Sequence, residues 1–315
     1  MSKFKIFVDG QEGTTGLEIN ERLKNRNDIE ILRINSQKIE VLWDVNERAK
    51  YINQADIVFL CLPDDAARES VSLIDNPSTR VIDASTAHRT ADGWVYGIPE
   101  LSAEHRKNIK TAKRLSNPGC FATGFNMLMY PLVKEKIVPA DYPATCHSVT
   151  GYSGGGIRLI ERFESEENKQ KLNSPCFYSL NLNHKHLPEM QKHSGLSNVP
   201  IFTPIIANYY RGMTVAIPLP NIKSTASEIN EFYKNYYQGQ YFVKIMSFNI
   251  QDELEWGFLN AEGCNYTNNI EIFVFGNDRQ ILVVARLDNL GKGASGAAIQ
   301  NMNIMLGIDE KYGLI

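Results

Sequence analysis

The sequence predicts an α/β protein in which a doubly wound parallel sheet precedes an α+β part with a mixed, largely antiparallel sheet. Short strand and helix patterns alternate over the first 120 residues, and repeated β-α-β units of this size build parallel sheets. Longer strand-like runs dominate the remainder. The length of 315 residues, 43% of them hydrophobic, suits about two domains.

The first part contains five predicted strands with helices between them. An apolar run opens the chain at 3–9, and a helical pattern follows from about 14 to 26. Further strands are predicted at 29–34, 56–62, 80–85 and 113–116, and further helices near 44–53, 64–74 and 102–109. This alternation is typical of a nucleotide-binding sheet.

The second part opens with a helical stretch at 121–136. Its strand patterns lie at 144–153, 201–219 and 241–248, and its helix patterns at about 156–171 and 225–236. Two more runs, 269–276 and 279–288, are joined at Asn277-Asp278 and predict an antiparallel hairpin. The last helical stretch, 294–307, has an apolar face. We therefore predict one domain from 1–117 with the C-terminal segment from about 294 to 315, and a second from 118–293.

Charge and cysteine content exclude several classes of function. Lys+Arg number 33 and Asp+Glu 36, so no basic excess favours nucleic acid or an anionic membrane, and a small molecule is the expected ligand. The longest apolar run, 57–62, is too short to cross a bilayer. Five scattered cysteines, without paired or zinc-type spacing, indicate a reducing, cytoplasmic setting and no metal site.

Glycines follow the first strand at the spacing G-x-x-G-x-x-G. Gly10, Gly13 and Gly16, with Thr14 and Thr15 between them, open the first helix. Glycines there let the backbone approach a pyrophosphate, whose charge the helix N-terminus stabilises. The spacing differs from the usual G-x-G-x-x-G, but its place in a β-α-β unit supports a Rossmann-type dinucleotide site.

The end of the second strand indicates which dinucleotide binds. It carries Arg33, Ser36 and Lys38, with no acidic residue until Glu40. A free ribose 2′-hydroxyl favours Asp or Glu at this place, whereas a 2′-phosphate favours cationic side chains. We therefore expect NADP; the alternative is that these are ordinary exposed loop residues.

A cysteine follows Pro-Gly at the start of a helix. The dipole of a helix can lower the pKa of a thiol at its N-terminus, so Cys120 is a candidate nucleophile. A nucleophilic thiol also needs a proton acceptor and donor, a role suited to histidine. His184 and His186 lie together, with Glu189 following where a helix begins.

These motifs resemble a known family when taken together. The glycine turn, Asn117-Pro118-Gly119-Cys120, the stretch 184–189, Arg211-Gly212-Met213 and the segment 290–303 occur in this order. They resemble the N-acetyl-gamma-glutamyl-phosphate reductases, the arginine-biosynthetic branch of the aspartate-semialdehyde dehydrogenase superfamily, in their compact second type. The resemblance covers essentially the whole chain.

The resemblance implies NADPH-dependent reduction of an acyl phosphate to an aldehyde, with release of inorganic phosphate. Cys120 matches the nucleophile that forms a thioester, and His186 matches the acid/base histidine. His184 matches a neighbour nearer the substrate, although either histidine could reach the thiol. Asn117 could hold the developing oxyanion.

Other positions match the family's substrate and cofactor segments. Arg89 and Arg211 are candidates for the substrate's phosphate or carboxylate, since arginine binds both in bidentate fashion. On the cofactor side the matching residues are Ser85, Asn289, Gly293 and Gly296, and Gly154 lies in a glycine-rich segment, 151–156, whose backbone could approach the nicotinamide closely. The sequence departs from the commoner Ser-Ala-Asp-Phe-Arg form at Ser85–Arg89, which leaves the role of His88 open.

Two alternatives remain open at this point. One is the same chemistry on another acyl phosphate, such as aspartyl phosphate or an N-blocked aminoadipyl phosphate. The other is a non-catalytic NADP-binding module in which Cys120 is a redox-labile thiol. The resemblance also implies a homo-oligomer, either a dimer or a tetramer.

Overall fold

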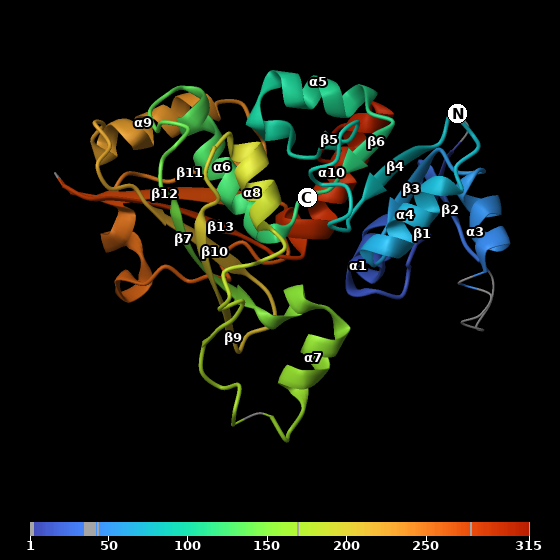
Figure 1. The fold of residues 1–315 in the computed structure, drawn as a ribbon, viewed down its shortest axis with the longest axis horizontal. Coiled ribbons are helices and arrows are strands. Elements are labelled where there is room, and N and C mark those ends of the chain that lie inside the picture. Colours follow the sequence, from blue (N-terminus) through green and yellow to red (C-terminus); the bar gives the residue numbers. More distant parts are fainter. Residues whose placement is uncertain (1–2, 35–41, 43, 169, 278, 315) are drawn as a thin grey trace. The chain divides into compact units, whose positions relative to one another are not determined.

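The computed structural model describes residues 3–34, 42, 44–168, 170–277 and 279–314. The chain forms two compact units (Figure 1). The first comprises Met1–Pro118 with Ala294–Ile315, and the second comprises Gly119–Gly293. The chain therefore leaves the first unit immediately before the predicted nucleophile and returns to it at the C-terminal helix.

The first unit is built on a parallel sheet of six strands in the order β2-β1-β3-β4-β6-β5. Its strands are β1 (Phe4–Asp9), β2 (Ile29–Leu32), β3 (Ile57–Leu60), β4 (Arg80–Asp83), β5 (Val95–Tyr96) and β6 (Arg114–Ser116). Every residue of β3 is buried, as expected for a central strand covered on both faces.

The strand order distributes the helices over both faces of this sheet. The helices are α1 (Thr14–Leu23), α3 (Val45–Ile52), α4 (Asp64–Ser72), α5 (Ala103–Thr111) and α10 (Gly296–Leu306). Right-handed crossovers place a helix on one face when the sheet grows one way and on the other when it grows the opposite way. Accordingly α10 contacts α1 and α5, whereas α3 contacts α4. The predicted doubly wound architecture is confirmed.

A buried ion pair joins the end of β1 to the helices beyond it. Asp9, 3% exposed, accepts hydrogen bonds from Arg48 Nε at 3.2 Å and Ser70 Oγ at 2.7 Å. Arg48, 1% exposed, also donates to Glu69 Oε2 at 2.7 Å. These contacts fix the backbone immediately before the glycine turn, because Asp9 is the residue that precedes Gly10.

Replacing Arg48 with alanine leaves the Asp9 carboxylate buried without its cation. We expect the free energy of unfolding to fall by about 3–5 kcal/mol, measured by urea denaturation. Lys24→Ala is the control, because its ion pair with Glu21 is exposed and is expected to contribute less than about 1 kcal/mol. Equal losses in the two variants would contradict the assignment.

The second unit contains a mixed sheet of seven strands in the order β11-β12-β13-β10-β7-β9-β8. The strands are β7 (Thr145–Gly151), β8 (Cys176–Phe177), β9 (Ile201–Ala207), β10 (Met213–Pro218), β11 (Val243–Ile245), β12 (Ile270–Gly276) and β13 (Ile281–Leu287). Four of the six strand pairs are antiparallel, and β12 and β13 form the predicted hairpin. Its predicted turn residue Asp278 lies outside the described residues.

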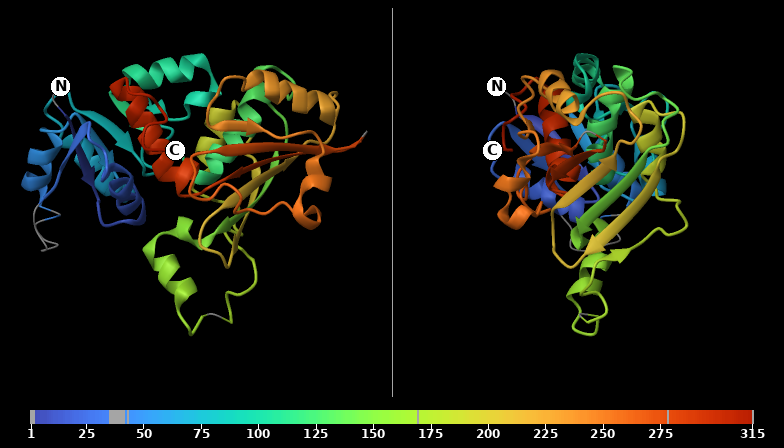
Figure 2. Two further views of the ribbon diagram at one scale, coloured as in Figure 1. Left: turned by 180° about the vertical axis from the view of Figure 1, so that it is seen from behind. Right: turned by 90° about the vertical axis from the view of Figure 1, so that its left-hand side faces the viewer.

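Helices α6 (Cys120–Lys134), α8 (Leu187–Ser194) and α9 (Ala226–Tyr236) lie on one side of this sheet, whereas α7 (Ile157–Glu164) projects from the strand ends (Figures 1 and 2). The α6 helix crosses the strands closely at Gly124, where a Cβ would lie 2.6 Å from Val215 Cγ2. Val215 therefore faces α6, and its neighbours Thr214 and Ala216 face the opposite side.

The clearest differences from the sequence prediction lie in three parts of the chain. The single run expected at 201–219 is two strands, β9 and β10, which pair with opposite edges of β7 rather than with each other. The chain reverses at Gly212, whose φ of +107° favours glycine. The helix expected at 156–171 ends at Glu164, and the two-residue strands β5 and β8 carried too few residues to show a period.

Candidate active site

The glycine turn has the geometry of a backbone cradle in the first unit. Gly10 has φ +84°, and a Cβ there would lie 2.4 Å from Cys61 O. A Cβ on Gly16 would lie 2.4 Å from Gly10 O, so the turn and the helix pack too closely for a side chain. A Cβ on Gly13 would have 3.7 Å to its nearest atoms. Gly10 and Gly16 are thus required by the fold, whereas Gly13 is not.

The start of α1 offers free donors toward this turn. Gly13 is the N-cap and provides no side-chain cap, so the amides of Thr14, Thr15 and Gly16 have no intrahelical acceptor. The buried Thr14 Oγ1 also has no hydrogen-bond partner among the described residues. A cavity of about 210 Å³ adjoins the turn, with an apolar wall that includes Ile34 and Leu62. Uncapped amides, an unpartnered hydroxyl and an apolar wall fit a dinucleotide's phosphates and ring.

The glycine geometry makes a prediction that separates folding from binding. Gly10→Ala should lower the free energy of unfolding by about 2 kcal/mol or more, because its Cβ meets the Cys61 backbone. Gly13→Ala should leave stability within about 1 kcal/mol of the unaltered chain but weaken NADPH binding about tenfold or more, because only a ligand needs that space. Denaturation and calorimetric titration measure the two effects. Unchanged NADPH affinity in Gly13→Ala would contradict phosphate binding at the turn.

Of the three residues expected to select NADP, only Arg33 is described. Its side chain is exposed directly after β2 and has no hydrogen bond or ion pair with the described residues. It is therefore available to a 2′-phosphate. Ser36 and Lys38 lie outside the described residues.

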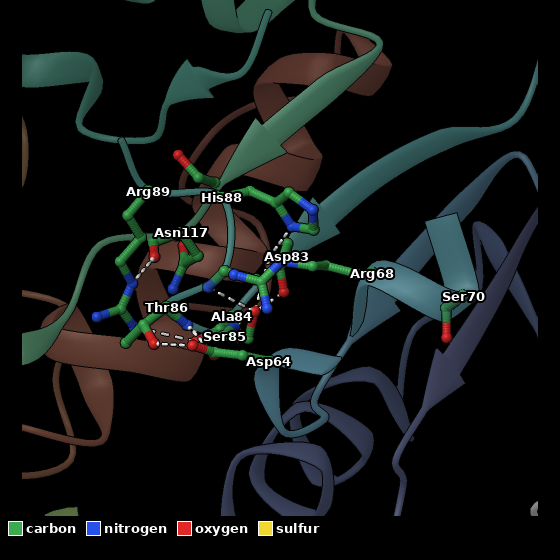
Figure 3. Close-up of polar contacts among 12 residues, drawn as sticks. Asp64, Arg68, Ser70, Asp83, Ala84, Ser85, Thr86, His88, Arg89 and Asn117 are labelled. Atoms are coloured by element: carbon green, nitrogen blue, oxygen red, sulfur yellow. Dashed lines mark hydrogen bonds and ion pairs between the residues drawn. The ribbon is translucent and has the colours of Figure 1, made fainter. Parts of the chain in front are cut away.

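The loop after β4 brings Ser85, Arg89 and Asn117 together in the first unit (Figure 3). Arg89 Nε donates to Asn117 O at 3.1 Å, and Nη2 donates to Ala84 O at 3.0 Å. Asn117 uses its side chain to donate to Ala294 O and to accept from Asn301 Nδ2. These bonds hold the backbone of the segments on which Arg89 and Asn117 lie. The substrate role expected for Arg89 and the oxyanion role expected for Asn117 therefore stay predictions.

In the second unit, Cys120 is the first residue of α6. The N-cap Gly119 has no side-chain cap, and its N–H donates to Glu189 Oε2 at 3.1 Å. Cys120 forms no disulfide, and it is half-buried. Its position at the uncapped end of a 15-residue helix favours the thiolate, because the dipole stabilises negative charge there.

Both candidate histidines lie in the same cluster, on the segment that leads into α8. The rings of His184 and His186 are 4.8 Å apart, and each also contacts Phe121, the residue after the nucleophile. His184 Nδ1 accepts the His186 N–H at 3.1 Å, which holds His184 in a neutral form. His186 Nε2 lies 4.0 Å from Glu189 Oε1.

Glu189 connects the nucleophile turn with His186. It is 1% exposed, and one carboxylate oxygen accepts from the Gly119 amide while the other adjoins His186. Sequence reasoning noted Glu189 only as a helix start. Its position three residues after His186 was the signal, because that spacing brings two side chains at a helix N-terminus together.

Tyr178 is a second residue that sequence reasoning missed. Its ring meets the edge of the His184 ring at 5.8 Å. Burial, followed by the nearby Cys120 thiol, raises the pKa of the phenol, which therefore stays protonated as a donor. The short strand β8 that positions Tyr178 had no readable pattern, so nothing in the sequence indicated it.

Arg211 and Asn289 belong to a second polar group in this unit. Arg211 Nη1 contacts Asp288 Oδ2 at 3.3 Å, and its guanidinium lies over the Tyr266 ring at 4.5 Å. Asn289 accepts from Gly212 N at 2.8 Å and donates to Ser153 Oγ at 2.9 Å. Asn289 also lies beside Gly154, where a Cβ would be 3.2 Å from its amide nitrogen.

The glycines of the late segment fall in different units. Gly293 lies against the nucleophile, because a Cβ there would be 2.7 Å from Cys120 Cβ. Gly296 begins α10 in the first unit. The structure thus associates Gly293 with the thiol, and Gly154 with Asn289. None of the helices in the described part of the chain has the length and apolar character needed to cross a membrane.

Two family models match this chain, one in each of the two units. Residues 5–109 match the family model of the semialdehyde dehydrogenase NAD binding domain, and residues 120–289 match that of the semialdehyde dehydrogenase dimerisation domain. The fold resembles aspartate semialdehyde dehydrogenase II from Vibrio cholerae with a TM-score of 0.70 at 12% identity, covering 98% of this chain and 99% of that one. An NADP complex of the Candida albicans aspartate semialdehyde dehydrogenase has a TM-score of 0.63 at 14% identity, covering 97% and 99%.

Sequence relatives are more specific. N-acetyl-gamma-glutamyl-phosphate reductase 2 from a Nostoc species is 48% identical over the full length of both chains. The protein of the same name from Pseudomonas putida is 44% identical over 98% of each chain. With this similarity along its whole length, the chain belongs to the N-acetyl-gamma-glutamyl-phosphate reductases, within the semialdehyde dehydrogenase family.

Proposed function

We propose that this chain reduces N-acetyl-γ-glutamyl phosphate to N-acetylglutamate 5-semialdehyde with NADPH, in arginine biosynthesis. One observation carries the proposal: a thiol at the first residue of a helix, with Glu189 joining the preceding amide to His186. That arrangement suits formation and breakdown of a thioester. The full-length similarity to reductases of this name supports the choice of substrate.

In the first half-reaction, the Cys120 thiolate attacks the acyl carbonyl carbon. The carbon–oxygen bond to the phosphate breaks, inorganic phosphate leaves with the bonding electrons, and the acyl group becomes a thioester on Sγ. His186 takes the thiol proton, and the buried Glu189 carboxylate beside it stabilises the resulting imidazolium.

NADPH, when bound, supplies the hydride that reduces the thioester. His186 then donates its proton to the oxygen of the thiohemiacetal and takes it back as the carbon–sulfur bond breaks, which releases the aldehyde and restores the thiolate. The neutral Tyr178 phenol offers a further donor in this part of the site. We assign NADPH to the glycine turn and to Arg33, whose free charge suits a 2′-phosphate.

Arg211 is our candidate for the substrate's carboxylate. Its guanidinium is 4% exposed and is held by Asp288 and Tyr266, so its direction is set before a ligand arrives. A preset guanidinium binds a carboxylate with little ordering cost. Arg89 is assigned to the phosphate more weakly, because two of its nitrogens already donate to backbone carbonyls.

A reverse-direction assay tests the proposal. We expect N-acetylglutamate 5-semialdehyde to reduce NADP only when inorganic phosphate is present, with aspartate semialdehyde and NAD as much poorer reactants. Turnover with aspartate semialdehyde alone would support the proposed reaction but show that its substrate is aspartyl phosphate. No turnover with either aldehyde would favour a non-catalytic NADP-binding module.

We further infer a homodimer that forms through the sheet face opposite α6. The residues there are partly buried or exposed and run across three neighbouring strands: Ala216, His147, Thr203, Val149, Ile205 and Ile201. Ile201 is 53% exposed. A half-exposed apolar face within a segment that matches a dimerisation domain supports a second copy as its partner.

Val149→Arg tests the dimer by placing a charge in the middle of this face. We expect light scattering to report a dimer for the unaltered chain and a monomer for the variant. Val45→Arg, at an exposed residue that begins α3 in the first unit, is the matched control. An unaltered chain that is monomeric at micromolar concentration, or a Val149→Arg variant that stays dimeric, would contradict the interface.

We also place the enzyme in the cytoplasm. None of the five cysteines forms a disulfide, and three of them, Cys61, Cys120 and Cys176, are only partly buried. A thioester mechanism needs its thiol reduced, which a reducing compartment provides.

A further inference from the structure

The carboxylate of Asp83, at the end of β4, accepts three hydrogen bonds from the loop that follows it (Figure 3). Oδ1 accepts from Ser85 N at 2.9 Å, and Oδ2 accepts from Ser85 Oγ at 2.8 Å. Oδ2 also lies 2.6 Å from His88 Nδ1. Asp83 is fully buried, so this carboxylate organises the loop from beneath.

His88 is held on its other side by an aromatic ring. It stacks on Trp94 with ring centroids 4.0 Å apart and planes 12° apart. An ionised carboxylate only accepts, so the proton of the His88–Asp83 contact belongs to Nδ1. Stacking on Trp94 therefore holds the His88 ring in place, and the His88 N–H orients the Asp83 carboxylate. That carboxylate in turn orients the Ser85 hydroxyl.

The hydrogen bonds of Ser85 determine what else it can bind. A hydroxyl has one donor and two acceptor sites. The Ser85 proton goes to Asp83 Oδ2, and one acceptor site is used by Ala87 N at 3.1 Å. One acceptor site remains, so a ligand that meets Ser85 must present a hydrogen-bond donor. The neighbouring Thr86 hydroxyl likewise donates to a carboxylate, that of Asp64.

The strand order indicates which part of a dinucleotide meets this loop. Pyrophosphate is assigned to the turn after β1, and the 2′-phosphate to Arg33 after β2. The order β2-β1-β3-β4 places the β4 loop two strands beyond β1, about 10 Å away on the side opposite β2. The nicotinamide half of the cofactor therefore extends toward Ser85. Its hydrogen-bond donors are the carboxamide NH₂ and the ribose hydroxyls.

We propose that Asp83 and His88 are positioning residues that fix Ser85 as an acceptor for a hydrogen-bond donor in the nicotinamide riboside half of the cofactor. This inference rests on the proposed NADPH-dependent function. It assigns His88 a role through Asp83, without direct contact to the ligand. The pyrophosphate of the dinucleotide, a diester that carries only acceptors, is excluded as the partner of Ser85.

Binding measurements with three ligands test the inference without turnover. Calorimetry of Ser85→Ala should show NADP bound about fivefold more weakly, while 2′-phospho-ADP, which lacks nicotinamide riboside, is unaffected. The 3-acetylpyridine analogue replaces the carboxamide NH₂ with a methyl group. If Ser85→Ala leaves its affinity unchanged, the NH₂ is the donor; if its affinity falls like that of NADP, a ribose hydroxyl is. Ser72→Ala, on the exposed part of α4, is the control.

His88→Phe tests the positioning role, because it keeps a ring beside Trp94 but removes the donor to Asp83. It should weaken the binding of NADP but not of 2′-phospho-ADP. In a chain that already carries Ser85→Ala, it should cause no further loss of NADP affinity. His88→Asn, whose amide can donate from near the Nδ1 position, should restore part of the affinity.

Three results separate the inference from the proposed function. If the unaltered chain and Ser85→Ala bind NADP with the same affinity, the inference alone is overturned. The same holds if Ser85→Ala weakens the binding of 2′-phospho-ADP as much as that of NADP. Failure of the unaltered chain to bind NADP would overturn the cofactor assignment, and the inference with it.

Discussion

Cys120→Ala should lose reductase activity by a factor on the order of 10⁴ or more, because it removes the sulfur that carries the acyl intermediate. The substitution removes one sulfur at a half-buried position, so folding and NADPH binding should persist. Steady-state rates in both directions, with calorimetry of NADPH, measure the two properties. Retained activity above a hundredth of the original would contradict a cysteine nucleophile.

The other thiols provide internal controls for this assignment. Burial raises the pKa of Cys146 and of Cys264 to about 12, and burial with the nearby Asp83 and Asp9 raises that of Cys61 further still. A raised thiol pKa keeps the unreactive protonated form at neutral pH. Iodoacetamide at pH 7 should therefore modify Cys120 first, with protection by the acyl substrate. Cys176→Ser should remain fully active, because that thiol donates to Ser174 O at an exposed position.

His186→Asn should lower kcat by about 10²–10⁴-fold, since the thiol and the thiohemiacetal oxygen lose their proton carrier. Glu189 is then left beside a neutral amide, and the alkylation rate of Cys120 should fall as well. Alkylation reports the thiolate directly and does not require turnover. A purely structural role for His186 would lower stability without changing this rate at equal folded fraction.

His184→Asn distinguishes the two histidines. His184 Nδ1 accepts the His186 amide, so His184 supports the segment and lies near the substrate without serving as the main base. We expect a larger effect on KM than on kcat, together with a nearly normal alkylation rate. A kcat loss greater than that of His186→Asn would reverse the assignment.

Much of the fold could be predicted because local patterns agree with the tertiary structure. The buried strand 57–60 and the glycine turn at 10–16 read correctly from composition and spacing. The run 201–219 did not, because β9 and β10 are both strand-like and Gly212 is the one glycine in the short connection 208–212 between them. A pattern of apolar residues does not report which neighbour a strand will pair with.

The helix predicted after residue 156 was too long, because the charged residues that follow its true end also fit a helical pattern. Polar residues such as Glu166 and Lys171 suit an exposed helix as well as an exposed turn, so the sequence does not mark the end at Glu164. The two-residue strands β5 and β8 exist only through their partners β6 and β9. Their pairing is tertiary information.

The candidate site shows the same limit. Cys120 and the histidines are chemically conspicuous, but Glu189, Tyr178 and Asp83 act through neighbours that are distant in sequence or hidden in a strand end. Supporting residues of this kind are recognisable only from contacts. Arg89 and Asn117 have side chains suited to ligand binding, yet both make hydrogen bonds to backbone carbonyls of the fold. The residue type alone does not reveal this.

The most direct test of the central claim is intact-protein mass spectrometry after mixing the enzyme with N-acetyl-γ-glutamyl phosphate in the absence of NADPH. We predict a single added N-acetylglutamyl group on the peptide that contains Cys120, removed by hydroxylamine and absent from Cys120→Ala. Addition of NADPH should discharge it as the semialdehyde. An enzyme that turns over but shows no adduct, or carries the acyl group on another residue, would contradict the thioester mechanism.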